Sequence, residues 1–182
     1  MISIDPTIGW TISTALSMIF VASAVMKLID LNEFCGAVEN YRIVPEQISR
    51  VVAILVPIAE ITGALGVIIP NTHRGAAMLL SMLLIVFTTA IAINLLRGRR
   101  NIDCGCFGPA LRQQISWWLP ARNLAMLAML GVVMMPVSPR RLAPLDLATI
   151  FLAGTTLAVL YSAANFLVAN APHLRAIEIA DA

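Results

Sequence analysis

The chain has 182 residues, of which 59% are hydrophobic and only 12% are charged, and its mean hydropathy is +0.88. A soluble domain is about half apolar and a quarter charged, so this composition is typical of a membrane protein. The net charge of +2 argues against nucleic acid as a partner, because that partner requires a clustered basic face.

A membrane-spanning helix needs about 20 mainly apolar residues. Five stretches reach or approach this length, and they cover residues 8–29, 50–69, 75–96, 117–135 and 146–169. Backbone polar groups in hydrocarbon must be satisfied within their own segment, which favours helices. The first stretch is longer than the core of a signal peptide and no basic residue precedes it, so we interpret it as a retained helix. The sequence predicts an all-α integral membrane bundle of about five transmembrane helices, in one domain over residues 1–182.

The three cysteines are predicted to lie at the same face of the membrane. Each span carries the chain to the opposite face, so the loop after the first span and the loop after the third share a side. Cys35 falls on the first of these loops, and Cys104 and Cys106 fall on the second. The three thiols can therefore meet, whichever way the protein is inserted.

Polar side chains at membrane depth are predicted to gather in the half of the bilayer nearest these cysteines. They are Lys27, Glu60, Asn94, Arg122, Asn123, Tyr161 and Asn165. An ionisable group at this depth costs about 2.5 to 3.5 kcal/mol on insertion scales and usually marks a function or a buried pair. Glu60 can serve as the proton acceptor for thiol chemistry or for the redox chemistry of a bound quinone, or it can pair with Lys27 or Arg122. We favour the structural pairing.

Two other features receive simpler interpretations. Ala59, Gly63 and Gly66 form a small-residue face suited to close helix packing. His73 falls in a short loop on the side opposite the thiols, and we assign it no role.

The motif DCGCFG, which follows the third span, favours thiol chemistry over a permanent cross-link. A disulfide between Cys104 and Cys106 would need a distorted backbone to meet the usual geometry, and Gly105 supplies that freedom. Strained, exposed disulfides are easily reduced and tend to be catalytic or regulatory. The arginines before the motif favour the thiolate, whereas Asp103 opposes it.

Other interpretations of the cysteines stay open. The CxC motif can be a tight turn with two idle thiols. It can also belong to a soft-metal site of about four ligands, for which Cys35, Cys104, Cys106 and His173 are available without a supporting spacing. Cys35 lies in a polar, helical-looking stretch expected along the membrane interface. It is either a third thiol that attacks the disulfide or a small apolar residue packed on the first helix.

The order of features resembles that of the methylamine utilisation protein MauE family, which is related to DoxX-like membrane proteins. The features are YR followed by Pro45, Glu60 in the second span, LLRGRRNIDCGCFG after the third, and ISWWLPARNL at the start of the fourth. The resemblance implies a multi-pass protein of the bacterial inner membrane that helps to mature the disulfide-rich β subunit of methylamine dehydrogenase. It also implies a thioredoxin-like companion, and disulfide formation or isomerisation as the chemistry.

The leading hypothesis is therefore a membrane maturation factor acting as a thiol-disulfide oxidoreductase. Cys104 and Cys106 would cycle between dithiol and disulfide, Cys35 would be a shuttle thiol, and Glu60 with Arg122 would shape the polar pocket below. A quinone or a thioredoxin-like protein would recharge the pair; the sequence contains no cofactor motif. The alternatives are a non-catalytic scaffold for a thioredoxin-like partner and a soft-metal carrier.

The distribution of basic residues conflicts with a simple periplasmic oxidase. Nine lysines and arginines flank the thiol side and three flank the other, so the positive-inside rule places the thiol loop in the cytoplasm. Two explanations stay open. Some arginines, such as Arg122, can be functional groups rather than orientation signals, or the chain can relay electrons between compartments through a partner.

Overall fold

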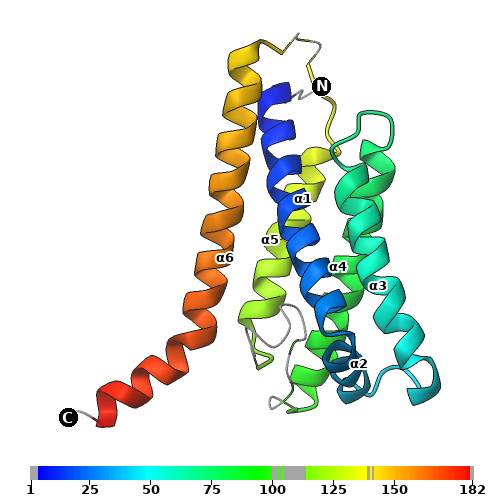
Figure 1. Cartoon of the computed structure of the whole chain (residues 1–182), viewed down its shortest axis with the longest axis vertical. Coiled ribbons are helices and arrows are strands. Elements are labelled where there is room, and N and C mark those ends of the chain that lie inside the picture. Colours follow the sequence, from blue (N-terminus) through cyan, green and yellow to red (C-terminus); the bar gives the residue numbers. More distant parts are fainter. Residues whose placement is uncertain are drawn as a thin grey trace.

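The computed structural model describes residues 4–99, 102, 104, 114–138, 140 and 142–180, with side chains described up to residue 171. Within these ranges the chain forms six helices (Figure 1). They are α1 (Pro6–Ile29), α2 (Leu31–Asn40), α3 (Glu46–Gly66), α4 (His73–Leu96), α5 (Trp118–Val133) and α6 (Pro144–Ala180). The predicted all-α class is confirmed.

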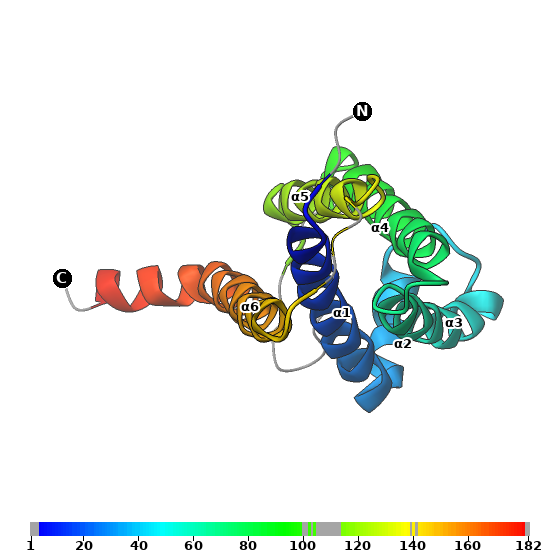
Figure 2. The same ribbon diagram turned by 90° about the horizontal axis from the view of Figure 1, so that it is seen from above.

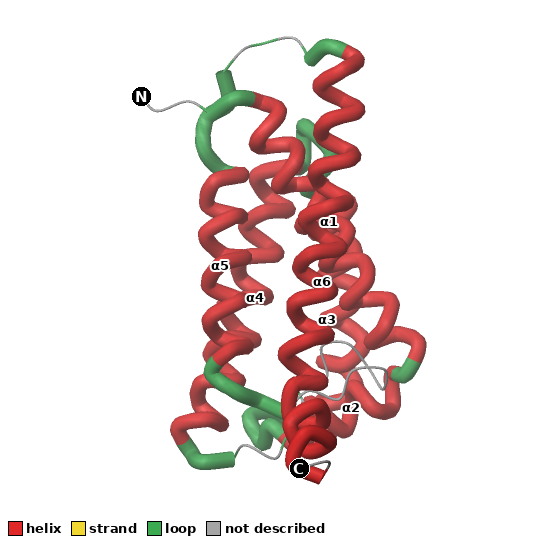
Figure 3. The backbone as a smooth tube through the Cα atoms, turned by 90° about the vertical axis from the view of Figure 1, so that its left-hand side faces the viewer, coloured by secondary structure: helices red, strands yellow, loops and turns green. Residues whose placement is uncertain are grey.

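Four of these helices, α1, α3, α4 and α6, are long and apolar enough to cross a membrane. Helix α5 has 16 residues and is therefore about 24 Å long, somewhat less than the roughly 30 Å of a hydrocarbon core. It nevertheless runs alongside the longer helices (Figure 3). The bundle of about five helices is thus found, with the fourth predicted span shorter than a full crossing.

Helix α6 extends well past the predicted end of the last span. It continues for 37 residues, to Ala180, and its last turns lean away from the other helices (Figure 1). Seen from above, α6 lies at one edge of the bundle beside α1 (Figure 2). This contact is close because a Cβ built on Gly154 would lie 2.9 Å from the Cβ atom of Thr14.

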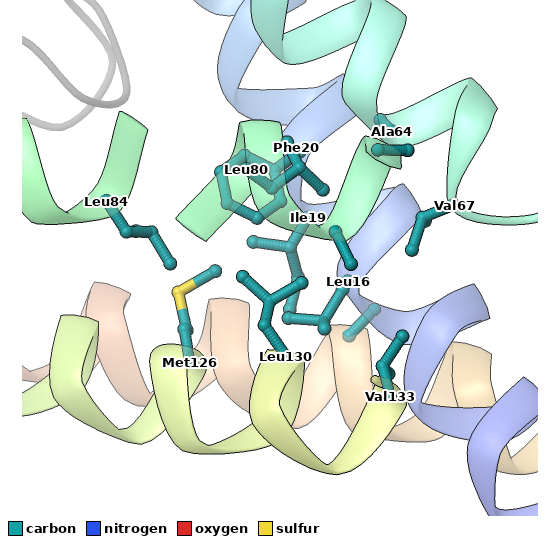
Figure 4. Close-up of a cluster of buried hydrophobic side chains, with 13 residues drawn as sticks. Leu16, Ile19, Phe20, Ala64, Val67, Leu80, Leu84, Met126, Leu130 and Val133 are labelled. Carbon is teal, nitrogen blue, oxygen red and sulfur yellow. The ribbon is translucent and has the colours of Figure 1, made fainter. Parts of the chain in front are cut away.

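The main apolar core lies where α1, α3, α4 and α5 meet (Figure 4). Leu16 and Phe20 of α1 pack with Leu80 of α4 and Leu130 of α5. The small-residue face predicted on α3 is used here: a Cβ on Gly63 would lie 2.6 Å from a methyl carbon of Leu80. Close helix approach at such positions is how small residues stabilise membrane bundles.

One end of the bundle is formed by α2, the last turns of α4 and the start of α5, and we call it the thiol end. Helix α2 is short and lies against α3 (Figure 1). Helix α4 stops at Leu96, and Gly98 follows with a φ of +72°. This left-handed conformation suits glycine and turns the chain into the loop that carries Cys104.

Candidate functional site

Cys104 is anchored in a small apolar cluster at the thiol end. The cluster joins the end of α2, the last turns of α4 and the start of α5, and its other members are Tyr41, Ile91, Leu95, Ile102, Ile115 and Leu119. The backbone N–H of Ile115 donates to the carbonyl oxygen of Ile102 at 3.0 Å, which ties the two sides of the loop together. Cys104 is disulfide-bonded and only 4% exposed. Its sulfur is therefore shielded from large reactants.

The other residues of the motif, Asp103, Gly105 and Cys106, lie outside the described residues. The roles predicted for them remain predictions.

Cys35 is a free thiol on α2, partly exposed, at the same end of the bundle. Its Sγ atom donates to Oε1 of Glu39 at 3.5 Å, one turn along the same helix. Burial raises the pKa of the Cys35 thiol, and the neighbouring Glu39 carboxylate raises it further. Cys35 is therefore held in the neutral thiol form, which is a poorer nucleophile than a thiolate.

An apolar cavity of about 120 Å³ lies between α2, α3 and α4, with Cys104 in its wall. Helix α2 contributes Phe34 and Ala37 together with its C-cap Tyr41, which share one face because they are three or four residues apart. Cys35 is rotated about 100° from Phe34, and so it lies off this face. The opposite wall includes Phe87 of α4.

A buried ion pair lies behind the aromatic wall of this cavity. Lys27 Nζ is 2.5 Å from Oε1 of Glu60, and the two side chains are 2% and 3% exposed. The ammonium also donates to Oγ of Ser23 at 2.9 Å. It lies 5.5 Å from the ring centre of Phe34 and 5.2 Å from that of Phe87, within range of cation–π attraction. Of the two partners left open for Glu60, the structure selects Lys27.

Arg122 has a different partner. Its Nη1 atom donates to Oδ1 of Asn165 at 2.6 Å, which links α5 to α6. Arg122 and the Lys27–Glu60 pair nevertheless line the same narrow cavity of about 40 Å³, together with Tyr161. The predicted polar pocket below the thiols therefore exists, although Glu60 and Arg122 are not paired with each other in it.

Two buried oxygen atoms in this region have no hydrogen-bond partner among the described residues: the Tyr41 hydroxyl and Oε2 of Glu60. Burial raises the pKa of Tyr41 more than the charge of Arg122 lowers it, so the phenol keeps its proton. Buried polar groups normally have partners, and exceptions call for an explanation. The Tyr41 backbone is fixed, because the amide of Asn94 donates to its carbonyl oxygen at 3.2 Å.

His73, to which the sequence assigned no role, joins helix ends at the opposite side of the bundle. Its Nδ1 lies 2.6 Å from the carbonyl oxygen of Val67, and its Nε2 lies 3.1 Å from that of Val133. Its ring also packs 5.2 Å from that of Trp10. These contacts hold α1, α3 and α5 together. Sequence spacing gave no signal for them, because two of the partners are backbone carbonyls, and Val133 and Trp10 lie on other helices.

The described residues contain no group of three or more His, Cys, Asp or Glu side chains placed to hold a metal. Cys106 and the side chain of His173, which the soft-metal interpretation needs, lie outside the described residues.

These features define a helical integral membrane protein with a buried, disulfide-bonded cysteine and a free thiol at one end, next to a buried ion pair. The family model of the methylamine utilisation protein MauE matches residues 5–136. The MauE protein of Paracoccus versutus is 43% identical over 90% of this chain and 88% of its own length. That of Paracoccus denitrificans is 40% identical over 90% and 89%, and that of Methylorubrum extorquens is 38% identical over 87% of both.

No solved structure matches the chain. The family model and the relatives show that the chain belongs to the MauE family, and the resemblance noted in the sequence is confirmed.

Proposed function

We propose that this protein acts in methylamine utilisation as a maturation factor in the bacterial inner membrane. Its client would be the β subunit of methylamine dehydrogenase, and its chemistry would be thiol-disulfide exchange at Cys104 and Cys106. The pathway is supported by the relatives, which are all methylamine utilisation proteins. The chemistry is supported above all by Cys104, which is disulfide-bonded and buried where the motif meets the bundle.

The burial of Cys104 suggests how the exchange is divided between the two sulfurs. A protein thiolate cannot reach a sulfur that is 4% exposed, so Cys106 is the sulfur that receives the attack and Cys104 is the leaving thiolate. The first step forms a mixed disulfide between the client and Cys106. A second client thiolate then attacks the client sulfur of that bond. The client gains a disulfide, and two electrons pass to the Cys104–Cys106 pair, which is left reduced.

A thioredoxin-like protein is the partner that fits this exchange, since it presents a reactive thiol pair of its own. Cys35 enters the proposal as an auxiliary shuttle thiol. Its hydrogen bond to Glu39 and its raised pKa make the Cys35 thiol attack a disulfide more slowly than a thiolate would. In this proposal the Cys104–Cys106 pair therefore completes the exchange without needing Cys35. Glu60 and Arg122 shape the polar pocket on which the thiol end rests.

The test is complementation of a strain that lacks the gene for this protein. We expect Cys104→Ser and Cys106→Ser, alone or together, to abolish active methylamine dehydrogenase and to leave β-subunit thiols unpaired, as measured by alkylation and mass spectrometry. Cys35→Ser is the matched control, and it should reduce the yield only partly. Membrane levels of each variant must equal those of the wild type.

Two results would contradict the proposal. Normal maturation by the double Cys104→Ser, Cys106→Ser variant would identify a scaffold that recruits its partner without redox chemistry. Stoichiometric binding of copper(I) or zinc to the purified wild-type protein, lost in the same variant, would identify a soft-metal carrier.

A further inference from the structure

We propose that the apolar cavity between α2, α3 and α4 binds the ring of a lipid-soluble quinone, which reoxidises the Cys104–Cys106 pair. This inference rests on the proposed function, because that exchange leaves the pair reduced and requires an electron acceptor. It adds the chemical class of the acceptor and the place where it binds.

The size and walls of the cavity suit a single flat ring. Its volume is about 120 Å³, somewhat below the roughly 150 Å³ of an apolar cavity that binds benzene, so the ring would fill it and its substituents would extend through the mouth. Phe34 and Phe87 line it from α2 and α4, and aromatic side chains favour stacked or edge-on contact with another ring. A fused ring system of two or more rings would require side chains to move.

The mouth of the cavity favours a ligand that arrives from the bilayer. Ile43 and Val86 line the cavity and are 44% and 58% exposed. Val86 lies on the membrane helix α4, where an exposed apolar side chain faces lipid, whereas Ile43 lies in the connection between α2 and α3. A hydrocarbon tail attached to the ring can therefore extend past Val86 into the bilayer.

Tyr41 can supply the polar contact that a quinone requires once its hydroxyl, which has less than 1 Å² of accessible surface, turns into the cavity. It lines the cavity, it is 8% exposed, and its hydroxyl has no hydrogen-bond partner among the described residues. A phenol in its protonated form donates one hydrogen bond, and a quinone offers carbonyl oxygens that accept one. The bound ligand would thereby satisfy a buried polar group that is otherwise unexplained.

Cys104 brings the redox partner to the same cavity. Its presence in the wall allows electrons to pass directly from the reduced pair to the ring. In the reaction, the two thiols lose two electrons and two protons as the S–S bond forms. The quinone takes up both electrons and both protons, one proton on each oxygen, and leaves as the quinol. The reaction consumes and releases no other species.

The first test measures binding without relying on thiol chemistry. Full-length protein in lipid nanodiscs, with its disulfide intact, is photolabelled with an azido-benzoquinone that carries a decyl tail, and the adducts are mapped by mass spectrometry. We expect adducts on α2 and α4 around the cavity. Ala90, which lines the cavity, is replaced in Ala90→Phe to fill it, and labelling should fall about tenfold or more. Ala163→Phe places the same side chain in a different apolar groove, beside α1 and α6, and should leave labelling unchanged.

The second test follows one round of oxidation. Protein reduced beforehand is mixed with decyl-benzoquinone, and quinol formation is compared with loss of alkylatable thiols, which should give one quinol for two thiols. Tyr41→Phe removes only the hydroxyl, so it guards against a folding defect in Ala90→Phe. It should weaken the apparent affinity by about two- to tenfold, the worth of one hydrogen bond.

Equal labelling of the wild type and Ala90→Phe would overturn the inference, as would adducts mapped to the groove beside α6 or thiols that quinone leaves reduced. If the Cys104→Ser, Cys106→Ser variant fails in maturation while these quinone tests are negative, the proposed function stands and this inference falls. If quinone binds and oxidises the pair while that variant matures its client normally, the proposed function falls and the quinone site stands.

Discussion

Replacing Glu60 by glutamine tests whether the buried ion pair is a main structural element of the bundle. The substitution keeps the size of the side chain and one acceptor oxygen but removes the negative charge. The Lys27 ammonium, at 2% exposure, would then be buried without its counter-charge. Removal of one partner from a buried pair costs about 3 to 5 kcal/mol for this reason.

The surroundings of Lys27 place the expected loss near the lower limit. The ammonium keeps its hydrogen bond to Ser23 at 2.9 Å and its contacts with the rings of Phe34 and Phe87. A desolvated cation–π contact is worth up to about 2 kcal/mol. We therefore expect Glu60→Gln to lower the free energy of unfolding by about 3 kcal/mol. For a chain of this length, that corresponds to a fall of about 6 to 12 °C in the thermal midpoint.

The assay is unfolding in detergent micelles followed by circular dichroism, with Glu46→Gln as the control. Glu46 is an exposed glutamate on the same helix, and its replacement should cost less than about 1 kcal/mol. The double variant Lys27→Met, Glu60→Leu removes both charges, and it should stay within about 1 kcal/mol of the wild type or exceed it. A double variant as unstable as Glu60→Gln would refute the reasoning, because the loss would then not come from an uncompensated charge.

Three further predictions test the thiol end and the helix packing. The rate of Cys35 alkylation should rise with pH, with its midpoint at a pKa above the usual thiol value near 9.0. Glu39→Gln should lower that midpoint, because the Glu39 carboxylate disfavours the thiolate. An unchanged midpoint would contradict the Cys35–Glu39 contact. Gly154→Ala should destabilise the fold by about 1 to 3 kcal/mol, because its new Cβ would clash with Thr14. The control Gly131→Ala, with no atom within 4 Å of the new Cβ, should be neutral or stabilise the fold by up to about 1 kcal/mol. Equal thermal midpoints for the two variants would argue against a tight α1–α6 contact. In intact cells, a membrane-impermeant maleimide should label Cys35 only after the inner membrane is opened, as the charge bias requires; labelling without that step would place the thiol end outside.

The number and extent of the helices were largely predictable because apolar length is a strong local signal. The predicted span over residues 75–96 became His73–Leu96, and that over residues 50–69 became Glu46–Gly66. The last helix was underestimated, since its final turns after residue 169 contain charged residues. A span predicted from hydropathy ends where the apolar run ends, but the helix itself can continue beyond that point.

The partners within the polar pocket were less predictable. Lys27, Glu60 and Arg122 all belong to the half of the bundle near the thiols, but which of them touch depends on the rotation of each helix about its axis. Hydropathy does not determine that rotation when a helix is apolar all round. The sequence therefore narrowed Glu60 to two partners, and packing selected one. The apolar cavity was not predictable for the same reason, because its walls come from separate elements.

The structure also bears on the orientation conflict left open by the sequence. Lys27 and Arg122 are 2% and 8% exposed and hydrogen-bonded inside the bundle, so they serve packing rather than orientation. Without them, seven basic residues still flank the thiol side against three on the other. Functional arginines alone therefore do not remove the bias, which leaves a relay between compartments as the stronger explanation. In such a relay the thioredoxin-like partner would carry electrons from the client to the thiol end, and a quinone in the proposed cavity would accept them from the Cys104–Cys106 pair.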